Sequence, residues 1–153
     1  MANIKWCAKN VLRFREPSES LAEDYLNSAK ETIDILKLIR GKSKIWEATC
    51  KYYCQYFAFY ALLSRLGIVS KKHECTIAVL RFLAKINVLN PKEPKQLEKD
   101  KKLREDNQYY LKNINISIDY NNLFQTILEI DNICKNIQDK EIMHIREQLK
   151  KVM

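Results

Sequence analysis

Apolar residues recur at every third or fourth position along most of the chain, which is the spacing of one face of an α-helix. In the first such stretch, Ile4, Cys7 and Val11 share a face, and basic residues occupy the opposite side. The pattern predicts helices over residues 3–15, 19–40, 44–66, 72–86, 95–111 and from about 120 to the C-terminus, with a break near Asp139. Residues 112–119 are expected to form a polar connection with some strand propensity.

Polar and glycine residues mark where these predicted helices begin and end. Ser20 and Glu23 have the S-x-x-E spacing of a capping box and are expected to start the second helix. Gly41 stands where a glycine commonly ends such a helix, and Gly67 is expected to end the third helix.

The third predicted helix is the most informative, because its polar stripe disappears in its second half. The run YFAFYALL at residues 56–63 is apolar on every side, and a helix that is apolar all round is buried all round. This helix is therefore either the centre of a bundle or partly covered by a second subunit. Between residues 52 and 60 this helix contains six aromatic residues: Tyr52, Tyr53, Tyr56, Phe57, Phe59 and Tyr60. Such a cluster is more typical of a core or a dimer seam than of a platform for stacking bases.

Length and composition set the fold class. The chain has 153 residues with only two glycines and three prolines, and 46% of its residues are apolar. So few helix breakers in a chain of this length predict one all-α domain over residues 1–153. The expected architecture is an up-and-down helical bundle of five or six helices, with its core at about residues 19–137.

The formal net charge of +8 favours an acidic partner such as RNA, DNA or an acidic protein, although Lys-rich chains commonly carry such a charge. Residues 92–104 hold six basic and three acidic side chains, which suits either a solvated helix or a surface that contacts phosphates. No apolar run is long enough to span a membrane, and the N-terminus has no signal-peptide pattern. We therefore expect a cytoplasmic protein without a membrane contact. Its five cysteines should be reduced thiols unless the host is a hyperthermophile.

Patterns for metal or cofactor chemistry are weak. Cys50 and Cys54 share a helix face, and His73 and Cys75 follow, but the spacing matches no zinc site and core packing is favoured for the thiols. Two glycines leave no P-loop and no dinucleotide-binding fingerprint. We expect no metal and no cofactor.

His73 is the strongest candidate for chemistry. Ser70 is the expected N-cap of the fourth helix, which places His73 in its first turn. The positive end of the helix dipole, together with Lys71 and Lys72, disfavours the imidazolium form there. A neutral imidazole could take a proton from a hydroxyl group. The simpler alternative is that His73 only bonds a loop carbonyl where the helix begins.

Three arginines could bind a phosphate next to this histidine: Arg65, Arg81 and Arg104. Arg81 follows His73 by about two helical turns, so the two side chains could face one cleft. The candidate residues for binding nucleic acid or a nucleotide are Lys71, Lys72, Tyr53 and Tyr109.

Residues 46–82, WEATCKYYCQYFAFYALLSRLGIVSKKHECTIAVLRF, resemble the HEPN family of small bacterial and archaeal helical proteins. The family pattern is a pair of tyrosines, small and apolar residues, a Gly-Ile turn, and a histidine that opens the next helix. The matching residues are Tyr52, Tyr53, Ala61, Leu62, Leu63, Gly67, Ile68 and His73. The later LREDNQYY, with Arg104, Tyr109 and Tyr110, is similar to the Arg-to-Tyr stretch of the same family. The resemblance covers most of residues 16–137.

The resemblance implies a helical bundle that dimerises and is often paired, as toxin and antitoxin, with a small nucleotidyltransferase-like protein. Catalytic members are metal-independent RNA endonucleases whose motif is an Arg, four to six residues, and a His. Here seven residues separate Arg65 from His73, so that motif is not intact.

Two hypotheses follow from the residues and the resemblance together. The leading one is a homodimeric toxin–antitoxin or defence-type protein that cleaves RNA. In it His73 transfers the proton, and Arg104, Arg81 or Arg65 binds the phosphate. The alternative is a non-catalytic module that binds a nucleotide or a nucleotidyltransferase partner.

Overall fold

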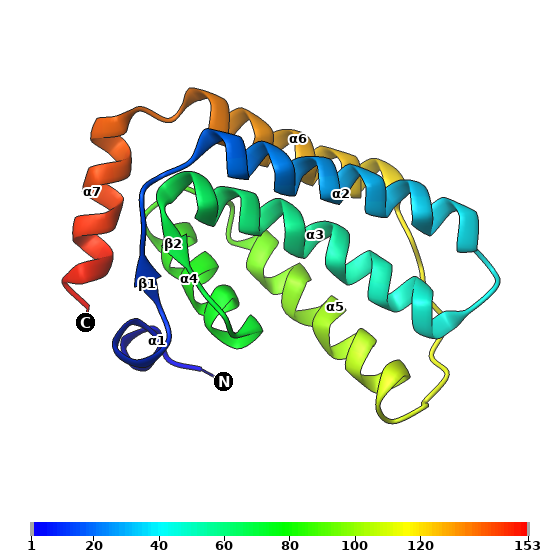
Figure 1. The fold of residues 1–153 in the computed structure, drawn as a ribbon. Helices are drawn as coiled ribbons and strands as arrows, with labels where there is room; N and C mark the ends of the chain where they lie inside the picture. Colours follow the sequence, from blue (N-terminus) through cyan, green and yellow to red (C-terminus); the bar gives the residue numbers. More distant parts are fainter. Residues whose placement is uncertain (1, 153) are drawn as a thin grey trace.

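The computed structural model describes residues 2–152, and seven α-helices make up most of this range (Figure 1). They are α1 (Ile4–Asn10), α2 (Glu19–Ile39), α3 (Lys44–Leu66), α4 (His73–Lys85), α5 (Lys92–Gln108), α6 (Tyr120–Asn136) and α7 (Asp139–Lys150). Two short strands, β1 (Arg13–Phe14) and β2 (Ile68–Val69), pair with each other. The predicted all-α class is confirmed. The number of helices exceeds the expected five or six because the last predicted helix is divided into α6 and α7.

Helix α3 lies at the centre of the molecule. Helices α2 and α5 run antiparallel to it, and α6 packs on both α2 and α3 (Figure 1). Tyr52, Phe59, Leu62 and Leu63 of α3 are completely buried. Burial of a large apolar side chain contributes about 1.5–3 kcal/mol to stability. The apolar run at residues 56–63 is thus covered mainly by helices of the same chain, which is the first of the two alternatives that the sequence left open.

Two of the predicted N-cap residues were wrong, although both helices begin within one residue of the predicted start, and the two predicted glycine ends were right. The N-cap of α2 is Ser18, whose side chain accepts the Leu21 N–H, so Ser20 lies inside the helix. The N-cap of α4 is Lys72 and not Ser70, which makes His73 the first residue of that helix. Gly41 and Gly67 both have φ near +75°, at +77° and +72°, a region that favours glycine after a helix.

The first predicted helix was too long. Helix α1 ends at Asn10, and the chain then becomes extended, with Arg13 opposite Val69 and Phe14 opposite Ile68. The following residue continues this contact, because the Arg15 N–H donates to the Gly67 carbonyl over 2.9 Å. Local periodicity could not reveal this pairing, because its partners are far apart in the sequence.

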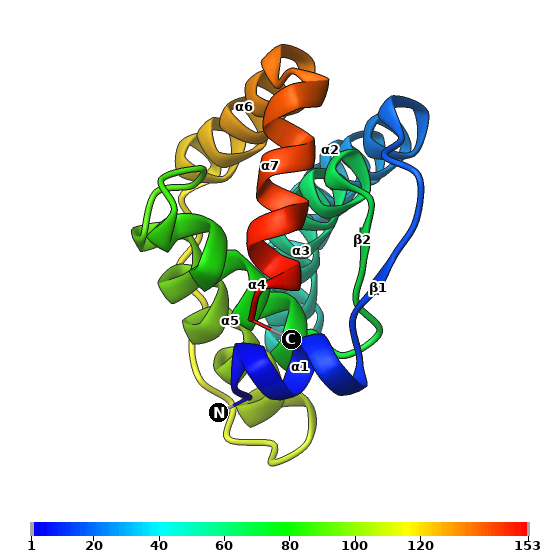
Figure 2. The same ribbon diagram turned by 90° about the vertical axis from the view of Figure 1, so that its left-hand side faces the viewer.

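Helix α7 lies across the end of the bundle, beside the two strands (Figure 2). The Arg146 guanidinium of α7 donates to the carbonyls of Arg15, Leu66 and Gly67, each at 2.9 Å. A Cβ at residue 67 would collide with the Arg15 carbonyl and the Arg146 side chain, so the close approach as well as the positive φ requires glycine here.

The remaining helix boundaries differ from the prediction by a few residues. Helix α5 begins at Lys92 and ends at Gln108, about three residues earlier at each end than expected, because Pro94 fits within a first helical turn. The predicted break near Asp139 is confirmed. Gln138 and Glu141 form a capping box at the start of α7.

The expectation of five reduced thiols is corrected by a disulfide between Cys7 and Cys75. It joins α1 to the first turn of α4, and both cysteines are buried. The apolar face of α1 packs on α4 and brings the two Cα atoms within 5.5 Å, a proximity that no local pattern shows. Cys50, Cys54 and Cys134 are free.

Removing this disulfide should weaken the fold. The bond closes a loop spanning 68 positions, and by the chain-entropy relation its loss lowers the free energy of unfolding by about 4 kcal/mol. Urea unfolding of the Cys7→Ser variant and of the reduced parent protein should therefore give the same lowered midpoint. The control is Cys50→Ser, which removes a free thiol and should keep the response to reductant. Equal midpoints for the oxidised and reduced parent would contradict the prediction.

Candidate functional site

His73 is held by two tyrosines of α3. Its Nδ1 lies 2.8 Å from the hydroxyl oxygen of Tyr52, and its ring stacks on that of Tyr56 with 4.3 Å between the centroids. Tyr52 is completely buried, whereas His73 is half-buried. A buried phenol hydroxyl normally finds a hydrogen-bond partner. This bond therefore fixes the orientation of the imidazole.

The corner between β2 and α4 is hydrogen-bonded to the same face of α3. Tyr56 and Tyr60 are one turn apart on α3 and point to one side of the helix. The Tyr56 hydroxyl lies 3.2 Å from Thr76 Oγ1, and Thr76 Oγ1 lies 2.9 Å from Ser70 Oγ. The Tyr60 hydroxyl donates to the Ser70 carbonyl over 3.0 Å. Ser70 thus belongs to the network that supports His73, although it does not cap α4.

Arg104 of α5 completes the cluster. The central carbon of its guanidinium lies 4.9 Å from the ring centroid of Tyr52 and 5.5 Å from that of Tyr53, and a terminal nitrogen is 3.5 Å from the Tyr53 hydroxyl. Within residues 2–152 this guanidinium forms no ion pair with a carboxylate, and its buried Nε has no hydrogen-bond partner. Arg104 is therefore held in place by stacking on tyrosines, while most of its donors remain uncommitted.

The surroundings set the protonation states of the cluster. Burial lowers the pKa of His73, and the positive charges of Arg104 and Lys101 lower it further, against a smaller opposing effect of Glu105. Burial raises the pKa of Tyr52, and it raises the pKa of Tyr56 to about 12. At neutral pH the imidazole is therefore neutral and both phenols keep their protons.

A neutral His73 in this position can act as a proton acceptor. The Tyr52–His73 hydrogen bond can form in either direction. When Nδ1–H donates to the Tyr52 oxygen, Nε2 carries a free lone pair and can accept a proton; when the Tyr52 hydroxyl donates to Nδ1, Nε2 carries the proton. The Arg104 guanidinium acts on the charge of the same imidazole and can bind an anion next to it. The arrangement is suited to removing a proton from a hydroxyl group whose reaction builds negative charge.

The structure brings Arg104 to His73 but directs Arg65 elsewhere. Arg65 is buried, and its guanidinium donates to the carbonyls of Cys134 and Ile137 and pairs with Glu19. These partners belong to α2 and to the end of α6, whereas the neighbours of His73 come from α3 and α5. Arg65 therefore stabilises the junction between α6 and the rest of the bundle.

Arg81 points into a groove between α4 and α5. It pairs with Glu98 across this groove, which has a volume of about 600 Å³. Lys101 and Glu105, which act on the pKa of His73, line the same groove. Arg81 therefore lines a groove that reaches two neighbours of His73. His73 itself does not line this groove, so the expected shared cleft is not found.

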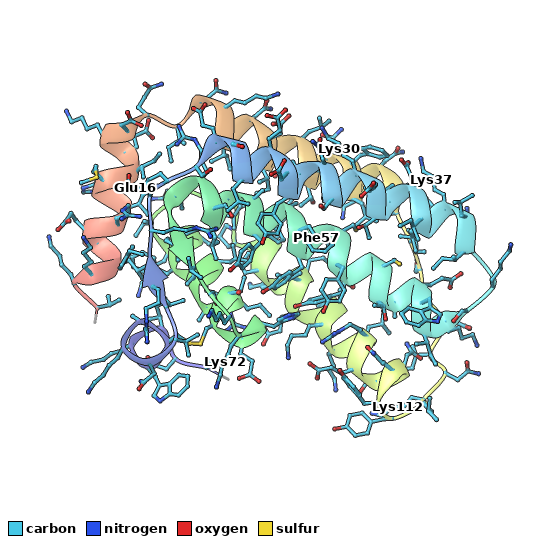
Figure 3. All side chains as sticks on the ribbon, viewed as in Figure 1. Glu16, Lys30, Lys37, Phe57, Lys72 and Lys112 are labelled. Carbon is cyan, nitrogen blue, oxygen red and sulfur yellow. A yellow bond between two sulfur atoms is a disulfide. The ribbon has the colours of Figure 1, made fainter. Side chains whose placement is uncertain are left out.

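The other predicted binding residues are spread around the cluster. Tyr53 is half-buried beneath Arg104. Lys72, labelled in Figure 3 at the start of α4, is exposed and lies 5.4 Å from the ring centroid of Trp6, and Lys71 is exposed beside it. Tyr109 is 63% exposed and caps the C-terminal end of α5, just over one turn beyond Arg104.

Sequence reasoning missed four residues that shape the site: Tyr52, Tyr56, Lys101 and Glu105. Tyr52 and Tyr56 were assigned to a core or seam, and only the placement of α4 reveals that their rings support a histidine. Lys101 is one turn before Arg104 on α5, so once Arg104 was chosen, helical spacing could have suggested it.

Comparisons with models of protein families, with curated proteins and with solved structures found no match to this chain. The resemblance to the HEPN family therefore stays a prediction. No group of three or more His, Cys, Asp or Glu side chains that could hold a metal ion occurs within residues 2–152. In the same range no helix has both the length and the apolar character needed to cross a bilayer.

The pKa of His73 should rise when the charge of Arg104 is removed. In Arg104→Gln it should increase but stay below the ordinary value of about 6.5, because burial is the larger cause and persists. Titration of the imidazole Cε1–H resonance by NMR measures this, with His144→Ala to assign the signal. Lys30→Gln removes the same charge from α2 and should leave the His73 pKa unchanged. A pKa that falls or stays constant in Arg104→Gln would show that Arg104 does not act on the imidazole.

Proposed function

We propose that this chain is a HEPN-like helical protein that cleaves RNA as part of a toxin–antitoxin or defence-type system. One observation supports the chemistry most directly. A neutral, half-buried His73 lies next to Arg104, a guanidinium without a carboxylate partner in the described chain, on a rigid layer of tyrosines. A base next to a free cation is what transfer of a hydroxyl proton at a phosphate requires.

The proposed reaction is attack of a ribose 2′-hydroxyl on the adjacent phosphate. His73 Nε2 takes the hydroxyl proton while the 2′-oxygen–phosphorus bond forms. The phosphorus–5′-oxygen bond then breaks, and the leaving oxygen takes a proton from solvent water. Arg104 binds the non-bridging oxygens, whose negative charge increases during the reaction. The products are a 2′,3′-cyclic phosphate and a 5′-hydroxyl end, after which His73 returns its proton to solvent.

The mode of assembly and the partners in this proposal come from the resemblance alone. A homodimer would place two His73–Arg104 pairs near one RNA strand, and a nucleotidyltransferase-like protein would be the cognate partner. The +8 net charge of the chain suits an RNA substrate, because phosphate contacts are the main source of affinity for nucleic acids.

The second candidate is a non-catalytic module that binds a nucleotide or a nucleotidyltransferase. The terminal nitrogens of Arg104, which form no ion pair among the described residues, favour it equally, because a guanidinium can bind a nucleotide phosphate without any proton transfer. The ring faces of Tyr52 and Tyr56 are already occupied by Arg104 and His73, which leaves them unable to stack a base. This occupancy favours a site for phosphate over a site for the base.

Replacing the histidine separates the two candidates. Cleavage of an end-labelled single-stranded RNA should fall by at least about 100-fold in His73→Ala and by a similar factor in Arg104→Ala. His144→Ala changes the other, exposed histidine and should cleave at the parent rate. A parent protein that leaves RNA intact, or a His73→Ala variant that cleaves equally well, rejects the nuclease proposal. ATP binding that depends on Arg104 in a protein without cleavage would support the second candidate.

The rate of cleavage should also depend on pH in a defined direction. A base must be unprotonated, so the rate falls as the pH drops through the pKa of His73. Because burial lowers that pKa, cleavage should persist at pH values below the ordinary histidine value of about 6.5. A rate profile between mildly acidic and neutral pH measures this. In Arg104→Gln the residual rate should begin to fall at a higher pH than in the parent, because the His73 pKa is higher in that variant.

A further inference from the structure

A basic pocket lies at the corner between α2 and α3. It has a volume of about 900 Å³ and is lined by residues 40–45 and Glu47 on one side and by Asn113 and residues 115–118 on the other. Arg40, Lys42 and Lys44 all line it. Three cations at alternate positions of one short turn give this pocket a strong positive potential.

The charges of this pocket are largely uncompensated. Glu47 is the one acidic residue of its lining, and that side chain is buried and accepts the Gly41 N–H. Within residues 2–152 none of the three basic residues forms an ion pair, whereas Arg65, Arg81, Lys51 and Lys101 all do. The pocket therefore keeps its positive charge available for a ligand.

Two of the three cations are held in place. Lys44 Nζ donates to the Asn113 carbonyl over 3.3 Å, and the Arg40 guanidinium lies 5.8 Å from the ring centroid of Tyr120. Asn115 and Ser117 add exposed neutral side chains that can donate hydrogen bonds. Positioned cations with neutral donors on the opposite wall are typical of sites that bind phosphate groups.

We propose that this corner pocket binds the sugar-phosphate backbone of the single-stranded RNA whose cleavage is proposed at His73, so the inference rests on the proposed function. Lys44 and Tyr52 are eight residues apart on α3, which places the pocket about 12 Å along the helix from the His73 support. A strand of a few nucleotides spans that distance. The corner pocket would fix the strand while the next phosphates reach Arg104.

The chain segment between Arg104 and the pocket residue Asn113 favours RNA over an acidic peptide. Tyr109 and Tyr110, at the C-terminal end of α5, are 63% and 70% exposed. Lys112, labelled in Figure 3 at this end of the molecule, lies 5.8 Å from the Tyr110 ring centroid and pairs with Asp106 over 3.3 Å. Exposed rings beside basic side chains are suited to stacking successive bases of a single strand, which an acidic peptide cannot use.

The test compares two triple variants that lose the same charge, both in the non-cleaving His73→Ala background. The corner variant is Arg40→Gln, Lys42→Gln, Lys44→Gln, and the control is Lys5→Gln, Lys9→Gln, Arg13→Gln, which changes exposed residues of the N-terminal segment. Binding of a fluorescent single-stranded RNA is measured over a range of salt concentrations. Circular dichroism checks that both variants keep their helices. RNA binding is also measured for the single variant Lys42→Glu, which changes one exposed residue of the pocket.

The corner variant should bind RNA at least about tenfold more weakly than the control at low salt. The slope of log K against log salt should decrease by about 2, because three phosphate contacts on a single strand are lost. Equal affinities and slopes for the two variants would overturn the inference. Polyglutamate or ATP that binds the corner more tightly than RNA but displaces little RNA would also overturn it, because the RNA would then be bound elsewhere.

The outcome for the corner is separable from that for the nuclease. Cleavage by the parent with equal RNA binding by both triple variants rejects the corner pocket and leaves the nuclease proposal in place. Weaker binding by the corner variant alone, with a parent protein that binds RNA without cleaving it, rejects the nuclease and supports the pocket. A parent protein that binds no RNA rejects both.

Discussion

Helix α3 has almost no solvent-facing side in its second half, and the rest of the molecule is arranged to cover it. Helices α2, α5 and α6 cover its length, while β2 and α7 pack near its C-terminal end. Covering this helix also buries the phenol of Tyr52, whose hydroxyl then needs a polar partner. His73 supplies that partner, and this is why the candidate site lies at the start of α4. The chemistry of the site follows from the packing of the core.

The arginines of the chain show how one residue type takes different roles according to its surroundings. Arg65 is buried among carbonyls and contributes to the fold. Arg81 is neutralised by Glu98. Arg104 rests on aromatic faces without a carboxylate among the described residues, which leaves its charge available. Sequence reasoning could not select Arg104 from the three, because the partner that decides each role comes from a different part of the chain.

What depended on neighbours along the chain was largely predictable. The extents of α2, α3 and α4 agree with apolar spacing, and Gly41 and Gly67 end helices as expected. The N-caps were harder, because Ser18 and Ser20 are both acceptable caps and only the path of the preceding chain selects Ser18. The pairing of β1 with β2, the Cys7–Cys75 bond and the approach of Arg104 to His73 join distant segments. The spacing of apolar residues cannot predict contacts between distant segments, so these contacts were found only in the structure.

Arg146 contacts the carbonyls of Leu66 and Gly67 at the end of the central helix, although it belongs to the last helix of the chain. During synthesis α3 emerges well before α7, so the Leu66 carbonyl has only water to bond until α7 is made, whereas the Gly67 carbonyl can already accept the Arg15 N–H. The hydrogen bonds from Arg146 therefore form later than the core around α3. The corner formed by α3, β1 and β2 should therefore become rigid only after α7 has emerged from the ribosome.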